Sequence, residues 1–167
     1  QVCMSVLPDV ASRLELPMMV ESNQTPLGTA FTIPVDHVSA RTGITAVERA
    51  TAVSAILNPE SSPHDFVRPG HLFPLVAKEG GVLRRAGHTE ATIDLARLSG
   101  KQPSGVLCEI LDKDGNRADR NGLQALAKQF GLEIISIEEL IRYRRTKEKL
   151  VERVAEAELP TKWGNFR

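Results

Sequence analysis

Apolar and polar positions alternate along the chain in short blocks that predict interleaved strands and helices. Blocks rich in β-branched and apolar residues, bounded by turn residues, predict strands at 2–6, 16–20, 29–33, 73–77, 105–111 and 132–137. Helical periodicity predicts helices at 8–16, 45–57, 89–98, 122–130 and from 136 through 154. Such interleaving is typical of a mixed α/β protein, whose sheet order the sequence leaves undetermined.

Two of the predicted helices carry a recognisable start signal. Thr45 and Glu48 have the Thr-x-x-Glu spacing of a capping box, in which each side chain bonds a free backbone N–H of the other residue. Ser136 and Glu139 repeat this spacing before the last helix. The polar stretch 21–28, which contains proline and glycine, is predicted to be a loop.

Composition narrows the class of protein. The 167 residues (18.3 kDa) are 41% hydrophobic and 25% charged, as expected for one globular domain. Basic and acidic residues balance at 21 each, so no net field draws the chain onto nucleic acid or an anionic membrane. The basic run at 142–147 is flanked by glutamates and predicts a solvated helix face. No apolar run approaches the length of a membrane span. From this and from the balanced charge we expect neither a membrane nor nucleic acid as a partner.

The cysteines and the chain start bear on cellular context. Cys3 and Cys108 fit neither a zinc pattern nor a Cys-x-x-Cys redox pair, which favours a reducing compartment. Neither cysteine has a basic neighbour that would lower its pKa, so both are expected to be buried packing groups. The chain begins at Gln1, inside a predicted strand and without an initiator Met. We therefore expect it to be a fragment.

Residues 85–89 combine features that suit a phosphate group. This run, Arg-Ala-Gly-His-Thr, stands where a glycine-containing turn meets the start of a predicted helix. Unpaired N–H groups point out of a helix N-terminus, and Arg85 and Thr89 add side-chain donors. The alternative is that Thr89 only caps the helix and Arg85 forms a surface ion pair. These five residues alone leave both interpretations open.

His71, His88 and Glu109 are the candidate acid–base or metal-binding groups. His71 follows Arg-Pro-Gly, a sequence that imposes an irregular backbone, and His88 lies within the candidate phosphate run. The alternative for each is a histidine without a functional role, either with its hydrogen bonds satisfied or exposed to solvent. Glu109 is a lone carboxylate in the apolar stretch 105–110, where burial without a partner would cost several kcal/mol. It either points into a cleft at the strand end or is exposed at a sheet edge.

Three motifs in this order resemble the 3,4-dihydroxy-2-butanone 4-phosphate synthase family of riboflavin biosynthesis. They are Arg-Pro-Gly-His at 68–71, Gly-Gly-Val-Leu-x-Arg-Ala-Gly-His-Thr-Glu-Ala at 80–91 and Gly-Val-Leu-Cys-Glu-Ile at 105–110. The resemblance implies a single, mixed α+β sandwich-like domain at 1–153 that lacks its N-terminal segment. Residues 154–167 resemble a linker towards a missing C-terminal GTP cyclohydrolase II domain.

The resemblance implies a lyase that converts D-ribulose 5-phosphate into L-3,4-dihydroxy-2-butanone 4-phosphate and formate. It further implies magnesium as cofactor, with manganese as an alternative ion, and a homodimer with sites at the subunit interface. The implied location is the cytoplasm, or the plastid stroma for a plant protein. Such chemistry needs a base for enolisation, an acid for loss of a hydroxyl, and a divalent ion that grips vicinal oxygens.

The family also implies roles for individual residues. His71 and Glu109 match the positions of proton transfer, and His88 matches a metal ligand. Arg85 and Thr89 match contacts to the substrate phosphate. The full set of implied substrate-binding residues is Cys3, Arg85, Ala86, Gly87, His88, Thr89 and Glu109.

Some features depart from the family pattern. The acidic loop that supplies the other metal ligand lies upstream of Cys3 and outside this sequence. Thr-Ala-Val-Glu-Arg at 45–49 stands where the family usually has Ser-Ala-x-Asp-Arg, and 115–118 differs from the usual Gly-x-Met-Ala-Arg. The alternative is therefore an inactive homologous domain that serves dimerisation or supports a fused cyclohydrolase domain. Nucleic-acid binding by the basic run is a third hypothesis, against which the zero net charge weighs.

Overall fold

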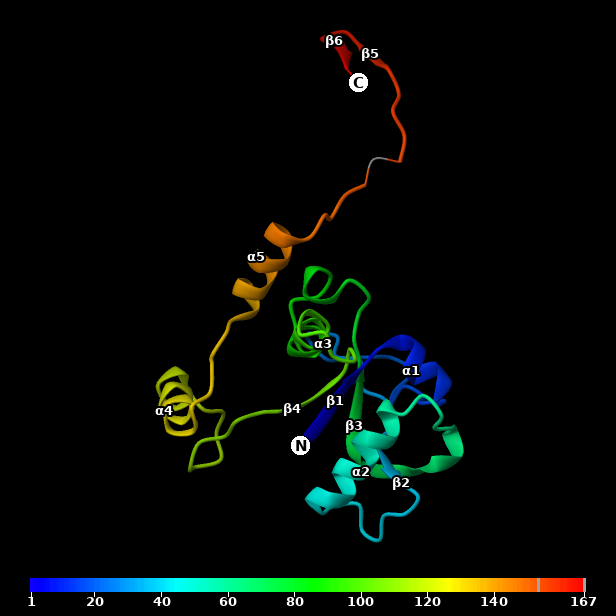
Figure 1. Ribbon diagram of the computed structural model, residues 1–167, viewed down its shortest axis with the longest axis vertical. Coiled ribbons are helices and arrows are strands. Elements are labelled where there is room, and N and C mark those ends of the chain that lie inside the picture. Colours follow the sequence, from blue (N-terminus) through cyan, green and yellow to red (C-terminus); the bar gives the residue numbers. More distant parts are fainter. Residues whose placement is uncertain (153, 167) are drawn as a thin grey trace.

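A four-stranded mixed sheet forms the centre of the protein in the computed structural model, which describes residues 1–152 and 154–166 (Figure 1). The strands are β1 (Val2–Val6), β2 (Val35–His37), β3 (Phe66–Val76) and β4 (Gly105–Cys108). Their order is β2-β3-β1-β4, with β1 parallel to β3 and the other two pairs antiparallel. The mixed α/β class predicted from the sequence is confirmed, and the structure supplies the sheet order.

The helices follow the predicted pattern closely in the middle of the chain. They are α1 (Pro8–Arg13), α2 (Ala46–Leu57), α3 (His88–Leu98), α4 (Arg120–Phe130) and α5 (Ile137–Lys147), with short 3₁₀ turns η1 (Pro63–Asp65) and η2 (Gly81–Leu83). Both predicted capping boxes are present, at Thr45 for α2 and at Ser136 for α5. The last helix ends at Lys147, earlier than predicted.

The predicted strand at 29–33 is wrong, because this segment forms only isolated bridges. Phe31 lies opposite Leu75, and the Thr32 N–H donates to the Pro74 carbonyl over 3.1 Å. Proline has no N–H to return this bond, so the ladder cannot continue beside Pro74. The predicted strand at 132–137 is also wrong. Its apolar side chains are exposed, and no strand among the described residues lies beside it.

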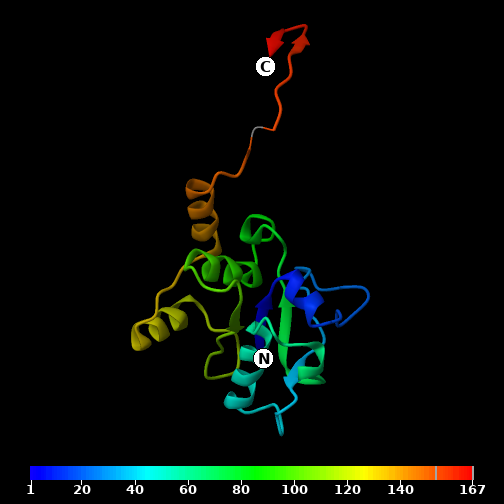
Figure 2. The same cartoon turned by 45° about the vertical axis from the view of Figure 1, so that its right-hand side comes forward.

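Helices cover both faces of the sheet. On one face, Met4 and Val6 of β1 pack with Leu14 and with Ile56 of α2 in the main apolar core. On the other face α3 lies so close that a Cβ added to Gly105 would sit 2.5 Å from Thr92 Cγ2. In both Figure 1 and Figure 2, α3 lies toward the top of the central body and α2 toward the bottom. The sheet is therefore packed between helices on its two faces.

Arg144 anchors α5 to the body of the protein. Its Nη1 donates to Asp94 Oδ2 over 2.9 Å and to the Gly80 carbonyl over 2.8 Å, while Nε and Nη2 donate to Glu148. Asp94 on α3 is 1% exposed and also accepts from the Val82 N–H. The prediction of a solvated face for the whole run 142–147 is therefore wrong at Arg144, which is buried. Hydrogen bonds from Arg144 lower the pKa of Glu148.

The C-terminal residues form a separate hairpin. Strands β5 (Leu159–Thr161) and β6 (Gly164–Phe166) pair antiparallel, away from the central sheet (Figure 1). The boundary expected at Arg153, like the last residue Arg167, lies outside the described residues. Within the described part of the chain, every helix is too short or too polar to cross a membrane.

We expect Arg144→Ala to lower the free energy of unfolding by about 3–5 kcal/mol, because it leaves the Asp94 carboxylate buried without its cation. Urea denaturation of the full-length protein measures this loss. The exposed neighbour Arg145 provides the control, and Arg145→Ala should change stability by no more than about 0.5 kcal/mol. Equal losses in the two variants would show that Arg144 does not anchor α5.

Candidate active site

The polar site at one end of the sheet is set up by a close backbone contact between β2 and β3. A Cβ added to Gly70 would lie 2.0 Å from the Val35 carbonyl carbon and 2.2 Å from the Asp36 nitrogen. The Gly70 N–H donates to the Pro34 carbonyl over 2.8 Å, and the strand register shifts between Val35 and Asp36. Glycine is needed here because any side chain would push the two strands apart.

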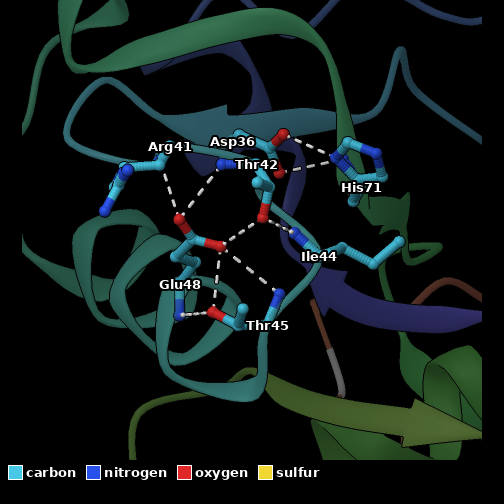
Figure 3. Close-up of polar contacts among 7 residues, drawn as sticks. All are labelled: Asp36, Arg41, Thr42, Ile44, Thr45, Glu48 and His71. Atoms are coloured by element: carbon cyan, nitrogen blue, oxygen red, sulfur yellow. Dashed lines mark hydrogen bonds and ion pairs between the residues drawn. The ribbon is translucent and has the colours of Figure 1, made fainter.

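This contact brings Asp36 against His71. Asp36 Oδ2 lies 2.7 Å from His71 Nδ1, and Oδ1 accepts the His71 backbone N–H over 2.9 Å (Figure 3). Asp36 is 9% exposed, whereas the His71 side chain is 44% exposed. A carboxylate acceptor assigns the proton to Nδ1 and orients the ring, so that Nε2 is the nitrogen available for proton transfer. The histidine predicted from the sequence therefore has a buried carboxylate as its partner.

Glu109 lies at the same end of the sheet as His71. Cys3 on β1 is in register with Phe73 on β3 and with Leu107 on β4. When this register is continued by two residues, Gln1 lies between His71 on one side and Glu109 on the other. His71 and Glu109 are then two strand spacings apart, which is about 10 Å. Glu109 is exposed just beyond the end of β4, an edge strand. Of the two alternatives from the sequence, exposure at a sheet edge is the one that the structure shows.

The two cysteines differ in their surroundings. Cys3 is buried, and this burial raises the pKa of its thiol. A protonated thiol is a poor nucleophile, so a packing or pocket-lining role suits Cys3. Cys108 is exposed, which corrects the expectation that both cysteines are buried.

The run 85–89 starts α3 in a way that the sequence did not reveal. Gly87 is the N-cap, and Thr89 is buried inside the first turn, so Thr89 is not the cap. Arg85 donates through Nη1 to Glu90 Oε2 over 2.5 Å and through Nη2 to Thr29 Oγ1 over 2.8 Å. Glu90, which is 1% exposed, also accepts the Lys78 N–H. Arg85 is thereby held beside the helix N-terminus by a buried acid.

His88 and Ala86 are the exposed members of this run. His88 is the first residue of α3, and its ring is free to meet a ligand from outside. The nearby acids Glu90 and Asp94 are buried and already bonded to Arg85 and Arg144. Within residues 1–152 and 154–166 no three histidine, cysteine or acidic side chains cluster as metal ligands. These residues alone therefore do not fit a magnesium ion, which prefers several oxygen ligands.

Asp36 is the site residue that sequence reasoning missed. It is the one acid in the stretch 29–38, which is otherwise apolar or neutral, and that isolation was an available signal. Its partner could not be named, because His71 lies 35 residues away and only the β2–β3 pairing joins the two.

Comparison with known proteins assigns the chain to a family. The model of 3,4-dihydroxy-2-butanone 4-phosphate synthase matches residues 1–143. Two proteins described as riboflavin biosynthesis protein RibBA, from Bacillus mycoides and Bacillus cereus, are 54% and 55% identical over 165 residues, which is 99% of this chain. The chain spans 42% of the length of each. It belongs to the 3,4-dihydroxy-2-butanone 4-phosphate synthase family.

Solved structures agree with this assignment. RibBX from A. baumannii, a two-domain 3,4-dihydroxy-2-butanone 4-phosphate synthase, is 42% identical with a TM-score of 0.92, covering 99% of this chain and 49% of that one. A 3,4-dihydroxy-2-butanone 4-phosphate synthase solved in complex with two magnesium ions is 39% identical, with a TM-score of 0.81, and covers 87% of this chain and 74% of that one.

We expect Gly70→Ala to separate β2 from β3 and to lower the free energy of unfolding by about 2 kcal/mol or more, because its Cβ would overlap the Val35 backbone. Chemical denaturation measures the loss. Gly122→Ala in the first turn of α4 is the control: its Cβ would lie 3.3 Å from Oδ1 of Asp119, an exposed side chain that can shift, so stability should change by no more than about 0.5 kcal/mol. A Gly70→Ala protein as stable as the parent would contradict the close contact.

Proposed function

We propose that this chain carries the catalytic machinery for converting D-ribulose 5-phosphate into L-3,4-dihydroxy-2-butanone 4-phosphate and formate. Family membership supports the reaction. The Asp36–His71 pair is the observation that carries the proposal, because it supplies an oriented base at the end of the sheet where Glu109 also lies. The five carbons of the substrate become four plus one, and the atoms balance without a co-substrate. Proton transfers are therefore the steps that the residues of this chain have to perform.

In this proposal His71 and Glu109 divide the proton transfers. His71 Nε2 accepts the proton that enolisation removes from a sugar carbon, and Asp36 stabilises the resulting imidazolium. In its protonated form Glu109 donates a proton to the departing hydroxyl, which leaves as water, and Glu109 later accepts a proton from the water that adds back.

The start of α3 is the proposed phosphate site. Its unpaired N–H groups and the Arg85 guanidinium favour an anion there. Arg85 has five N–H donors, and three are bonded to Glu90, Thr29 and the Leu27 carbonyl, so two remain for a phosphate. The proposed substrate contacts are Cys3, Arg85, Ala86, Gly87, His88, Thr89 and Glu109.

We further propose that a divalent cation, magnesium or alternatively manganese, assists the reaction. A 39% identical family member was solved with two magnesium ions, which supports this cofactor. When bound, the ion would polarise vicinal oxygens of the sugar. His88 is the ligand offered by this chain, and the remaining ligands would come from outside the described residues.

The assembly of the whole protein also remains a proposal. We propose a cytoplasmic homodimer in which residues 1–153 form the synthase domain and 154–167 lead towards a cyclohydrolase II domain. The length of the RibBA relatives, of which this chain spans 42%, supports the further domain.

The direct test is formate release from D-ribulose 5-phosphate by the full-length protein, with and without magnesium. The proposal expects release that EDTA abolishes and added magnesium restores. An inactive domain kept for dimerisation or support would release no formate under either condition, and that result would overturn the proposal.

We expect Glu109→Gln to lower turnover by roughly 10² or more, the usual scale for loss of a general acid–base group, while the fold is retained. The exposed Glu133 provides the control, and Glu133→Gln should keep parental turnover. Initial rates of formate release measure both variants. A Glu109→Gln enzyme within a few-fold of the parent would remove Glu109 from the mechanism.

Loss of Arg85 should weaken selectivity for the phosphorylated sugar. Because Arg85→Ala alone would leave Glu90 buried without its cation, we combine it with Glu90→Gln. Relative to Glu90→Gln, the double variant should bind D-ribulose 5-phosphate at least about tenfold more weakly, with little change for unphosphorylated ribulose. Calorimetric titration measures both affinities. Equal changes for the two sugars would assign Arg85 a purely structural role.

A further inference from the structure

Glu48 organises the exposed loop 41–45 that precedes α2. Its Oε1 accepts the backbone N–H of Arg41 over 2.7 Å and that of Thr42 over 3.1 Å (Figure 3). Its Oε2 accepts the hydroxyls of Thr42 and Thr45, each over 2.9 Å. One carboxylate thus collects donors from three residues of the loop, more than the capping box of α2 requires.

Apolar packing does little to hold this loop. Ile44 is 57% exposed and Val47, in the first turn of α2, is 76% exposed. The loop conformation therefore depends on the hydrogen bonds to Glu48. Those from the backbone of Arg41 and Thr42 make the largest contribution to lowering the pKa of Glu48 to about 2. The carboxylate is thus ionised at neutral pH, and its bonds are the stronger, charge-assisted kind.

The same loop lies directly on the Asp36 carboxylate. Gly43 is buried, has a φ of +73°, and a Cβ added to it would lie 2.0 Å from Asp36 Oδ2 and 2.6 Å from Oδ1. The backbone of Gly43 therefore occupies the space into which the Asp36 side chain would otherwise rotate. Asp36 is confined between this backbone and its partner His71.

We propose that Glu48 is a positioning residue for the Asp36–His71 pair: by fixing loop 41–45, it holds Gly43 over Asp36 and so keeps the Asp36 carboxylate against His71. Glu48 touches neither member of the pair and acts only through the loop. The effect on catalysis rests on the proposed function, whereas the effect on the Asp36–His71 contact does not. A displacement of about 1 Å in a catalytic group can cost roughly 10² in rate, so this restraint matters to turnover.

The structure offers a matched pair of variants. Glu48→Gln preserves side-chain size but replaces one acceptor oxygen with an NH₂ donor, so the loop donors cannot all be satisfied. Glu139→Gln makes the same change in the equivalent capping box of α5, which is not part of the site. Thr42→Val is a milder third variant, because it removes one donor to Glu48 and the long 3.4 Å contact from the Ile44 N–H, and leaves the α2 cap intact. Glu48→Asp keeps the charge and tests rescue.

The first readout is hydrogen–deuterium exchange of the full-length protein at single-residue resolution. The His71 N–H donates to Asp36 Oδ1, so its protection reports directly on the position of Asp36. We expect exchange at His71 and across loop 41–45 to accelerate about tenfold or more in Glu48→Gln and about threefold in Thr42→Val. Glu48→Asp should stay within about threefold of the parent, and Glu139→Gln should leave His71 at the parental rate.

The second readout is steady-state formate release. We expect kcat to fall about tenfold in Glu48→Gln with KM within about twofold, because orientation of the base is lost while the phosphate site is unchanged. Unchanged His71 exchange in both Glu48→Gln and Thr42→Val, or equal acceleration in Glu139→Gln, would overturn the proposal. If the parent releases no formate, the proposed function fails while the exchange data still decide the role of Glu48.

Discussion

The site depends on one steric constraint, the side-chain-free contact between β2 and β3 at Gly70. Because the Val35–Asp36 backbone occupies the place of a Gly70 side chain, the two strands approach closely enough for Asp36 to bond both the ring and the backbone N–H of His71. On its other side Asp36 meets Gly43. Two glycines therefore confine one carboxylate, and that carboxylate sets the direction of the candidate base.

Two buried ion pairs hold the start of α3, the proposed phosphate site. Glu90 and Asp94 lie one turn apart on α3, and each is 1% exposed and paired with an arginine from another segment. Since removing either partner would leave an uncompensated buried charge, the pairs fix α3 against its neighbours. The helix N-terminus that carries His88 is thereby kept at a set place relative to the sheet.

Local features of the site and fold were predictable from residue types and short spacings. The capping boxes at Thr45 and Ser136 were found from the sequence because they join residues only three positions apart. The prediction of a strand at 29–33 was wrong because Pro74 of the neighbouring strand has no N–H to donate there. Only the tertiary structure shows that these two segments lie side by side. The prediction of a solvated face at 142–147 was wrong at Arg144, because Arg144 bonds Asp94, which lies 50 residues away in the sequence.

By itself the sequence determined which residues have the chemistry: a histidine after Arg-Pro-Gly, a lone Glu109 after a strand, and an Arg-x-Gly-His-Thr helix start. It also determined the mixed α/β class, because hydrophobic periodicity is a local property. Only the tertiary structure decided that Asp36 partners His71, that Arg85 is held by Glu90, and that Gly43 closes over Asp36. The contacts of Asp36 depend on strand order and on the close approach of two backbones. The Arg85–Glu90 pair depends on where α3 begins. No pattern of neighbouring residues specifies either of these features.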